Sequence, residues 1–353
     1  MIYRKQTGFD DFRCIADKCP KSCCEGWQIM IDSDSLKKYQ NYSGTFEERL
    51  RTGIDKENSC FRQHQMRCHM LASTGLCDLQ SALGESYLCD TCRQFPRHME
   101  DFLDLREYSL SLSCPEAVRM LMDPEFIFGW TESEDEEYDD PEEFDDFDPF
   151  LFDKLTYGRD QMLRIAKDPS GPFQERMDLI ITASLKLQDL YDQGEIFEMD
   201  DISYDSPAGT SELQTEGSVY SYDYMMQSLK FLQDLEVLES SWSSILASTG
   251  DFWKKHPENS EEWKQILCPD RNLLRIFENL LQSFLFTYMC GSIYDGQIYA
   301  RTMIAAMNVR WILMLHIANP EIPLEKMIYL FSREIEHSDQ NINALISYFE
   351  EEL

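Results

Sequence analysis

Residues 298–318 read IYARTMIAAMNVRWILMLHIA and are apolar on nearly every side of a helix. A helix that is hydrophobic all round is buried, either inside a large protein or in a membrane. The longest uncharged run in the C-terminal half, residues 279–294, is too short to cross a bilayer. We therefore place residues 298–318 at the centre of a helical bundle and expect no membrane partner.

Apolar residues recur at helical spacing on both sides of this stretch. Pro172 opens one amphipathic helix and Gly194 stops it. The next apolar stripe covers residues 225–242, and the polar segment before it, residues 200–221, is expected to be a long loop. Further helix starts are indicated at Asp270, Pro323 and Ser338. Strand-like alternation is scarce, so we predict a mostly α fold with an α-helical domain at residues 150–353.

The charge of the chain is strongly acidic. Its 353 residues include 32 Lys and Arg against 65 Asp and Glu, a net charge of −33. Such a chain is a poor binder of nucleic acid, because phosphate backbones need a basic surface. The N-terminus has no apolar segment of the secretory kind, so we expect a cytoplasmic protein. Residues 131–148 contain 12 acidic residues and no basic one, and this self-repelling run predicts a linker or loop at residues 131–149.

The cysteines are concentrated near the N-terminus, where ten of the 12 lie at or before Cys114. In a cytoplasmic chain this density favours metal or redox chemistry over disulfides. Cys89 and Cys92 are separated by two residues, a spacing at which both thiolates can bind one ion. We therefore expect residues 1–130 to form an irregular, cysteine-rich module that is organised by a metal.

The residues alone leave the nature of this metal open. Four thiolates suit either a zinc ion or an iron–sulfur cluster, and the spacing does not choose between them. Three cysteines, Cys60, Cys268 and Cys290, are expected to pack as small apolar residues instead. Three classes of function remain: an enzyme, a zinc- or iron-binding scaffold that binds a partner, and a redox or metal-delivery protein with Cys23 and Cys24 as its reactive pair.

Three ordered motifs carry a family resemblance. They are FRCIADKCPKSCCEGWQIMID at residues 12–32, GLCDLQSALGESYLCDTCRQFPR at residues 75–97 and LSLSCPEAVRML at residues 110–121. In these motifs the chain resembles the flagellin lysine-N-methylase family, part of a wider group with a zinc- or iron-chelating CxxCxxCC domain. The resemblance implies methyl transfer from S-adenosylmethionine to lysine side chains of flagellin, with a cysteine-bound [4Fe–4S] cluster. The metal ligands that it implies are Cys14, Cys19, Cys23, Cys24, Cys68, Cys77, Cys89, Cys92 and Cys114.

A site for the methyl donor is not marked by a nucleotide-binding motif. The sequence contains no Gly-x-Gly, so a Rossmann fingerprint is absent, and we expect the donor pocket between the cysteine-rich module and the helices. Arg93 and Arg97 are candidates to clamp the donor's carboxylate, because guanidinium groups bind carboxylates through two hydrogen bonds. Trp27 is a candidate to line the channel.

A methyl acceptor must be a neutral amine, which requires a group that takes its proton. Candidates near the cysteines are Glu85, Tyr87, His64, His69 and His98. None of them stands out, so the catalytic residues stay open. The acidic surface is expected to attract lysine-bearing segments of a protein substrate.

Overall fold

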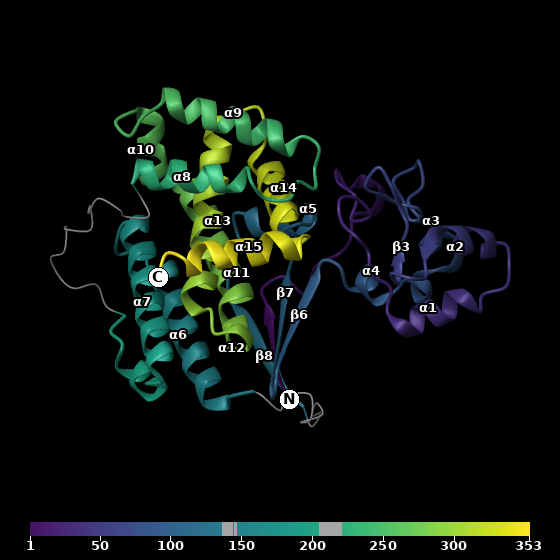
Figure 1. The fold of residues 1–353 in the computed structure, drawn as a ribbon, viewed down its shortest axis with the longest axis horizontal. Coiled ribbons are helices and arrows are strands. Elements are labelled where there is room, and N and C mark those ends of the chain that lie inside the picture. The colour runs from purple at the N-terminus through teal and green to yellow at the C-terminus, as the bar shows by residue number, and fades with distance from the viewer. Residues whose placement is uncertain (136–143, 145–146, 205–220) are drawn as a thin grey trace.

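The computed structural model describes residues 1–135, 144, 147–204 and 221–353. They form an elongated molecule with two parts, as Figure 1 shows. Residues 13–96 lie at one end, and from here on the name cysteine-rich module is used for these residues instead of for residues 1–130. The other described residues make the helical body, which lies at the other end. Helices α1 to α15 dominate the described chain, which confirms the predicted mostly α fold class.

A four-stranded sheet lies on the side of the helical body that faces the module (Figure 1). Its strands, in the spatial order β6-β7-β1-β8, are Arg97–Phe102, Leu105–Leu110, Ile2–Gln6 and Trp130–Glu134. β1 runs parallel to β7, with Ile2 opposite Leu105, and antiparallel to β8. The chain leaves the sheet after β1, builds the module and returns as β6. The module is therefore an insertion between two strands of one sheet.

Short elements build the module around a small hydrophobic cluster that includes Ile29, Leu50, Phe61 and Leu79. In chain order they are η1 (Ala16–Lys18), α1 (Ser33–Gln40), α2 (Glu47–Gly53), β2 (Ile54–Asp55), β3 (Cys60–Phe61), β4 (Gln63–His64), β5 (Arg67–Cys68), α3 (Asp78–Leu83), η2 (Glu85–Tyr87) and α4 (Asp90–Gln94). The strands form two separate pairs, β2 with β3 and β4 with β5.

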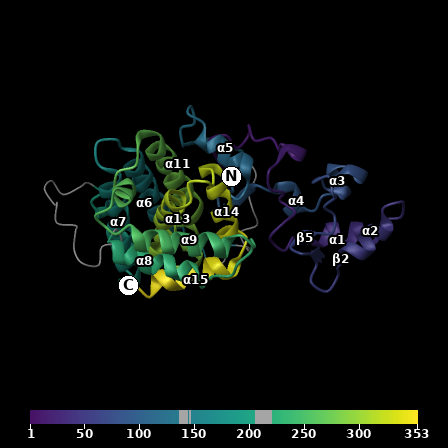
Figure 2. The ribbon, with the colours of Figure 1, turned by 90° about the horizontal axis from the view of Figure 1, so that it is seen from above.

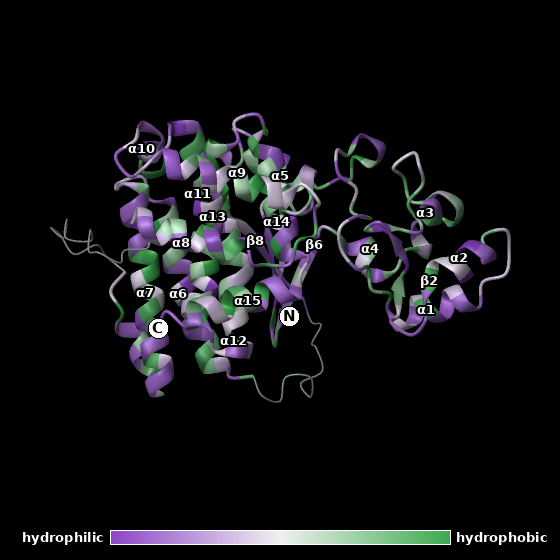
Figure 3. Cartoon of the chain, turned by 45° about the horizontal axis from the view of Figure 1, so that its top comes forward, coloured by the Kyte–Doolittle hydropathy of each residue, from purple (hydrophilic) through white to green (hydrophobic). Residues whose placement is uncertain are grey.

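Longer helices build the body around a second, larger core. They are α5 (Pro115–Met122), α6 (Pro149–Lys167), α7 (Phe173–Gln193), η4 (Ile196–Asp201), α8 (Tyr222–Leu232), α9 (Trp242–Lys255), α10 (Glu261–Leu267), α11 (Arg271–Tyr288), η5 (Met289–Gly291), α12 (Ser292–Asp295), α13 (Ile298–Ala318), α14 (Leu324–Glu336) and α15 (Asp339–Glu350). In Figure 3 the outer helices carry both hydrophilic and hydrophobic residues, as expected of helices with one face on a core.

Helix α13 lies at the centre of the body, as its apolar sequence predicts. It packs against α7, α11, α15, α9 and α14, and the view from above in Figure 2 shows it enclosed by its neighbours. Trp311, Ile312, Met314 and Leu315 on this helix have no exposed surface. No helix among the described residues is both long enough and apolar enough to cross a membrane.

The predicted helix boundaries are confirmed where a capping residue fixes them. The side chain of Asp270 accepts hydrogen bonds from the backbone N–H groups of Asn272 and Leu273 at the start of α11. Ser338 accepts one from Asn341 at the start of α15. Gly194 ends α7 in the left-handed conformation, with φ +73°, which glycine adopts without a steric penalty.

The continuous apolar stripe at residues 225–242 is not one helix. α8 ends at Leu232, and α9 begins only at Trp242. In the loop between them, the buried carboxylate of Glu334 accepts the backbone N–H groups of Leu238 (2.9 Å) and Glu239 (2.6 Å). These N–H groups bond to α14 instead of to a helical turn. A tertiary contact therefore overrides the local periodicity.

Two further regions differ from the sequence-based expectations. The sheet was not expected, because its strands are short. The turn between β6 and β7 also lacks the usual glycine signal, since Leu103 adopts the left-handed conformation there, with φ +56°. Residues 131–134 of the expected acidic linker form most of β8, where Glu132 pairs with Arg4 at 2.6 Å. The middle of this linker and residues 205–220 of the expected loop lie outside the described residues.

Candidate functional site

Six cysteines gather in the hydrophobic cluster of the module. An antiparallel bridge between Glu25 and Arg67 sets two chain segments side by side, and the backbone N–H of Cys68 donates to the carbonyl of Cys24 at 2.8 Å. The Cys24 thiol is hydrogen-bonded to that of Cys77. The thiols of Cys89 and Cys92 are likewise hydrogen-bonded to each other. The six members of this group, here called the inner thiols, are Cys23, Cys24, Cys68, Cys77, Cys89 and Cys92.

A second group, here called the outer thiols, contains Cys14, Cys19 and Cys114. They interact electrostatically with one another. Cys114 is buried, whereas Cys14 is exposed. The Cys19 thiol donates to the carbonyl of Lys21 at 3.1 Å. All nine cysteines expected as ligands therefore belong to one of two groups.

Three of these nine cysteines stand immediately before a helix. Cys77, Cys89 and Cys114 are the N-cap residues of α3, α4 and α5. The backbone N–H groups of the first turn act to lower the thiol pKa at each of these positions. Unpaired N–H groups at a helix start stabilise an anion. These N–H groups therefore offset part of the rise in thiol pKa at Cys77 and Cys114.

Burial acts in the opposite direction. It raises the pKa of Cys68 and of Cys114 to about 11. Within the hydrogen-bonded pair, the contact with Cys92 lowers the pKa of Cys89, while the contact with Cys89 raises the pKa of Cys92. Thiolates that lie close together in a buried site repel one another. The inner thiols can therefore lose their protons together when a cation neutralises them.

The donor set fits a thiolate-ligated metal by its chemistry. Six inner sulfur atoms exceed the four that a zinc ion or a [4Fe–4S] cluster takes, and the backbone N–H of Met70 bonds to the sulfur of Cys68. In the described part of the chain, however, no three His, Cys, Asp or Glu side chains stand in an arrangement that holds a metal ion. The sulfur atoms are gathered, but their coordination geometry is not preformed.

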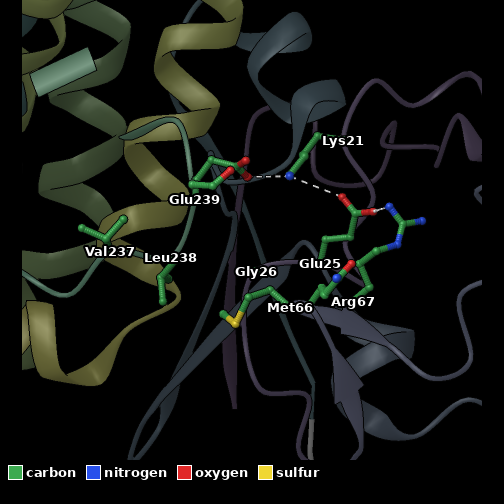
Figure 4. Close-up of a pocket in the computed structure, with 10 residues that line it drawn as sticks. Lys21, Glu25, Gly26, Met66, Arg67, Val237, Leu238 and Glu239 are labelled. Atoms are coloured by element: carbon green, nitrogen blue, oxygen red, sulfur yellow. Dashed lines mark hydrogen bonds and ion pairs between the residues drawn. The ribbon is translucent and has the colours of Figure 1, made fainter. Parts of the chain in front are cut away.

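A pocket of about 410 Å³ lies where the module meets the body. Figure 4 shows Lys21 between two carboxylates, at 2.5 Å from Glu239 and 3.3 Å from Glu25. Arg67 pairs with Glu25 from the other side at 2.5 Å. The pocket therefore presents two cations and two anions, alternating in one row. Its apolar lining consists of Met66, Val237 and Leu238.

The last turn of α14 holds the two parts together. Arg333, which is only 3 % exposed, donates to the carbonyls of Ser22 (3.1 Å) and Glu25. These two carbonyls flank Cys23 and Cys24. Arg333 also interacts electrostatically with the sulfur atoms of Cys19 and Cys23. A buried cation from the body thus lies beside both thiol groups.

The three predicted donor-binding residues lie in different places. The indole of Trp27 donates to the carbonyl of Cys23 at 2.8 Å and stacks on His337, with ring centroids 4.6 Å apart. The exposed guanidinium of Arg93 pairs with Asp90. That of Arg97 lies 5.2 Å from the ring of Phe12. None of the three lines the junction pocket.

Of the five candidate proton acceptors, His98 lies at the junction. Its ring bonds to Glu100 at 3.0 Å, and it interacts electrostatically with Glu336. Glu85 and His64 are exposed, and His69 and Tyr87 are half-buried within the module. Of the three cysteines expected to be apolar filler, Cys60 and Cys290 are buried, but Cys268 is exposed.

No sequence motif marks Arg333, Glu336 or His337. All three lie at the end of α14, more than 200 residues after the last cysteine of the module. Residues 333–337 read REIEH, which is ordinary for a helix end. The helical period places Arg333 opposite the apolar stripe of Leu324, Ile328 and Phe331, so no sequence signal marks it as buried.

Comparisons with known proteins relate the chain to lysine N-methylases. Residues 159–353, more than half of the chain, match the model of the FliB lysine N-methylase C-terminal domain. A lysine-N-methylase of Salmonella typhimurium is 32% identical over 124 residues, which cover 32% of this chain and 31% of that protein. The flagellar biosynthetic protein FliU of Salmonella muenchen is 33% identical over 124 residues, which cover 32% of this chain and 73% of that protein. No solved structure matches the chain.

The matched regions set the extent of this relationship. The alignment spans about a third of the Salmonella typhimurium protein, whereas the family model spans most of the helical body, including α11, α13 and α14. The chain therefore belongs to the FliB lysine N-methylase family.

Proposed function

We propose that this protein transfers a methyl group from S-adenosylmethionine to lysine side chains of flagellin, and that it does so at the module–body junction. Membership of the FliB lysine N-methylase family is the observation that carries the proposal. The name of the Salmonella muenchen relative, a flagellar biosynthetic protein, supports flagellin as the substrate. We place the activity in the cytoplasm, where thiols stay reduced.

The junction pocket is the proposed donor site. The methionine part of S-adenosylmethionine carries one ammonium and one carboxylate group, and the pocket offers both signs of charge. Lys21 and Arg67 suit the carboxylate, and Glu25 and Glu239 suit the ammonium. The side chains of Met66, Val237 and Leu238 supply apolar contact. A volume of about 410 Å³ is within the range of small-molecule sites.

The inner thiols are the proposed ligands of a [4Fe–4S] cluster, with zinc as the alternative occupant. Such a cluster would neutralise the buried thiolates and fix the loop of residues 19–26, which carries Lys21 and Glu25 into the pocket. The residues of this loop bind and orient the donor. Arg333 keeps the loop against the body through the carbonyls of Ser22 and Glu25.

The pocket is tested by donor binding to the anaerobically purified protein. We expect Lys21→Met to weaken S-adenosylmethionine binding at least tenfold in a calorimetric titration, since it removes a cation that faces both carboxylates of the pocket. Lys326→Met, an exposed lysine at the start of α14, is the matched control and should bind as the wild type does. Equal affinities in the two variants would remove this pocket as the donor site.

A further inference from the structure

A chain of hydrogen bonds connects two titratable residues at the end of α14. The Glu336 carboxylate accepts from the hydroxyl of Ser111. The hydroxyls of Ser111 and Ser113 are 2.5 Å apart, and that of Ser113 is 3.0 Å from Nε2 of His337. The side chains of Glu336 and His337 are thus joined through two serines that belong to the segment after β7.

One nitrogen atom at the histidine end of this series of hydrogen bonds has no partner. Nδ1 of His337 is buried and makes no hydrogen bond in the structure. An unsatisfied buried nitrogen costs free energy, so such an atom calls for a partner that the protein alone does not supply.

Two aromatic side chains of the module pack against His337. Trp27 stacks on its ring, and the ring of Phe95 meets it edge-on at 5.9 Å. Aromatic faces attract a cationic group and pack well on an aliphatic stem. Because Trp27 and Phe95 come from the module and His337 from the body, this position lies between the two parts.

Within this series of hydrogen bonds, a proton is held more strongly by Glu336 than by His337. Burial raises the pKa of Glu336 to about 7, and the groups that face it are Tyr288 from α11, Ser332 from α14 and His98 from β6, itself paired with Glu100. Burial, together with the charge of Arg333, lowers the pKa of His337 to about 3. The imidazole therefore passes on a proton that it receives, and the ionised carboxylate of Glu336 can accept and hold that proton up to about neutral pH.

We propose that the acceptor lysine binds beside Trp27, Phe95 and His337, and that His337, Ser113 and Ser111 relay its proton to Glu336. This inference rests on the proposed function, and it names the acceptor site of that reaction. The sequence of α14 did not indicate this site, because the site combines the end of α14 with the segment after β7 and with the module.

The proposed step moves one proton from the lysine to Glu336 and one methyl group from the donor to the lysine. The lysine ammonium gives a proton to Nδ1 of His337, Nε2–H passes one to Ser113, Ser113 passes one to Ser111, and Ser111 passes one to the Glu336 carboxylate. The neutral amine then attacks the methyl carbon of the sulfonium donor. The new N–C bond forms as the S–C bond breaks, and its electron pair stays on sulfur, which leaves as a neutral thioether.

The relay is tested by the pH dependence of methyl transfer to a lysine peptide. We expect Glu336→Gln and His337→Phe, both close in shape to the native residues, to lower kcat about 100-fold or more near neutral pH. At about pH 10 the amine loses its proton to solvent, so both variants should regain most of the wild-type kcat. Glu325→Gln on the same helix is the matched control and should keep the wild-type profile.

The outcomes separate the relay from the proposed function. Iron and sulfide content and donor affinity, measured on the same samples, must equal those of the wild type if the variants are correctly folded. An active wild type with unchanged variants, or variants that lose activity equally at all pH values, would overturn the relay alone. A wild type that methylates no lysine would overturn the proposed function as well.

Discussion

Cysteine at a helix start is the residue-scale feature on which the metal proposal depends. Cys89 is fully buried, caps α4 and bonds to the thiol of Cys92. We expect Cys89→Ser to lose most of the bound iron and acid-labile sulfide, because serine is a poor ligand for these metals. Cys268→Ser, at an exposed cysteine of the body, is the control and should keep its full content. The same loss of metal in both variants, or no loss in either variant, would contradict the assignment of the inner thiols as ligands.

A second residue-scale prediction concerns a buried ion pair of the body. Arg159 and Glu107 make two hydrogen bonds, of 2.5 and 2.6 Å, and are 0 % and 4 % exposed. Arg159→Met leaves the Glu107 carboxylate buried, with Arg4 at 3.5 Å as its remaining cation. Removal of one partner from a buried pair costs about 3–5 kcal/mol of unfolding free energy.

The measurement for this pair is urea unfolding followed by circular dichroism. Arg164→Met, an exposed arginine on the same helix, should change the unfolding free energy by less than about 0.5 kcal/mol. Similar losses in both variants would show that the pair contributes no more than a surface arginine does.

At the residue scale, the sequence predicts what short spacing can reveal. Cys89 and Cys92 are three positions apart, and the structure brings their thiols into contact. The spacing does not reveal that Arg333 lies beside Cys23, or that His337 stacks on Trp27. Those contacts join residues about 310 positions apart, and no local pattern specifies them.

At the scale of elements, the end of α14 joins the module to the body. We expect Arg333→Met to loosen the loop of residues 19–26, because the substitution removes donors to the Ser22 and Glu25 carbonyls. Amide hydrogen exchange in this loop should speed up at least tenfold, while helix content stays constant. Lys326→Met, at an exposed lysine two turns earlier on the same helix, should leave exchange unchanged. Equal exchange in wild type and Arg333→Met would mean that α14 does not hold the module.

Helix boundaries were predictable wherever a single residue sets them. Asp270 and Ser338 bond to N–H groups within their own first turn, so the sequence carries the whole signal. The break between α8 and α9 was not predictable, because Glu334, about 100 residues away, supplies the competing hydrogen bonds. The sheet was missed for a related reason, since β1 pairs with β7 across the whole inserted module.

At the scale of the whole molecule, buried carboxylates connect stability to pH. Burial raises the pKa values of Asp178, Glu334 and Glu336 to about 7 each. In the unfolded chain these groups titrate near pH 4. Between these values the folded protein holds more protons than the unfolded chain, so the free energy of unfolding falls as the pH rises from about 4.5 to about 7. The net charge of −33 acts in the same direction through self-repulsion.

Urea midpoints measured across this range test the linkage. The midpoint should be higher at about pH 5 than at about pH 7.5, and Asp178→Asn should make the difference smaller. A midpoint that rises steadily with pH would show that carboxylates with lowered pKa values, such as Asp32, dominate instead.

The division into module and body follows from the chain path. The inserted module has its own small core, with the inner thiols inside it. It meets the body through Arg333 of α14 and through Glu239 in the loop after α8. This arrangement puts the proposed donor pocket and the proposed acceptor site on the same seam.

The proposed function is tested most directly by methyl transfer itself. The anaerobically purified protein is incubated with flagellin and methyl-labelled S-adenosylmethionine, and flagellin peptides are then sequenced by mass spectrometry. We predict labelled methyl groups on lysine side chains of flagellin. The amount of label should be strongly reduced with Lys21→Met but not with Lys326→Met. Flagellin that stays unlabelled with a wild-type protein that contains its full iron and sulfide would contradict the account.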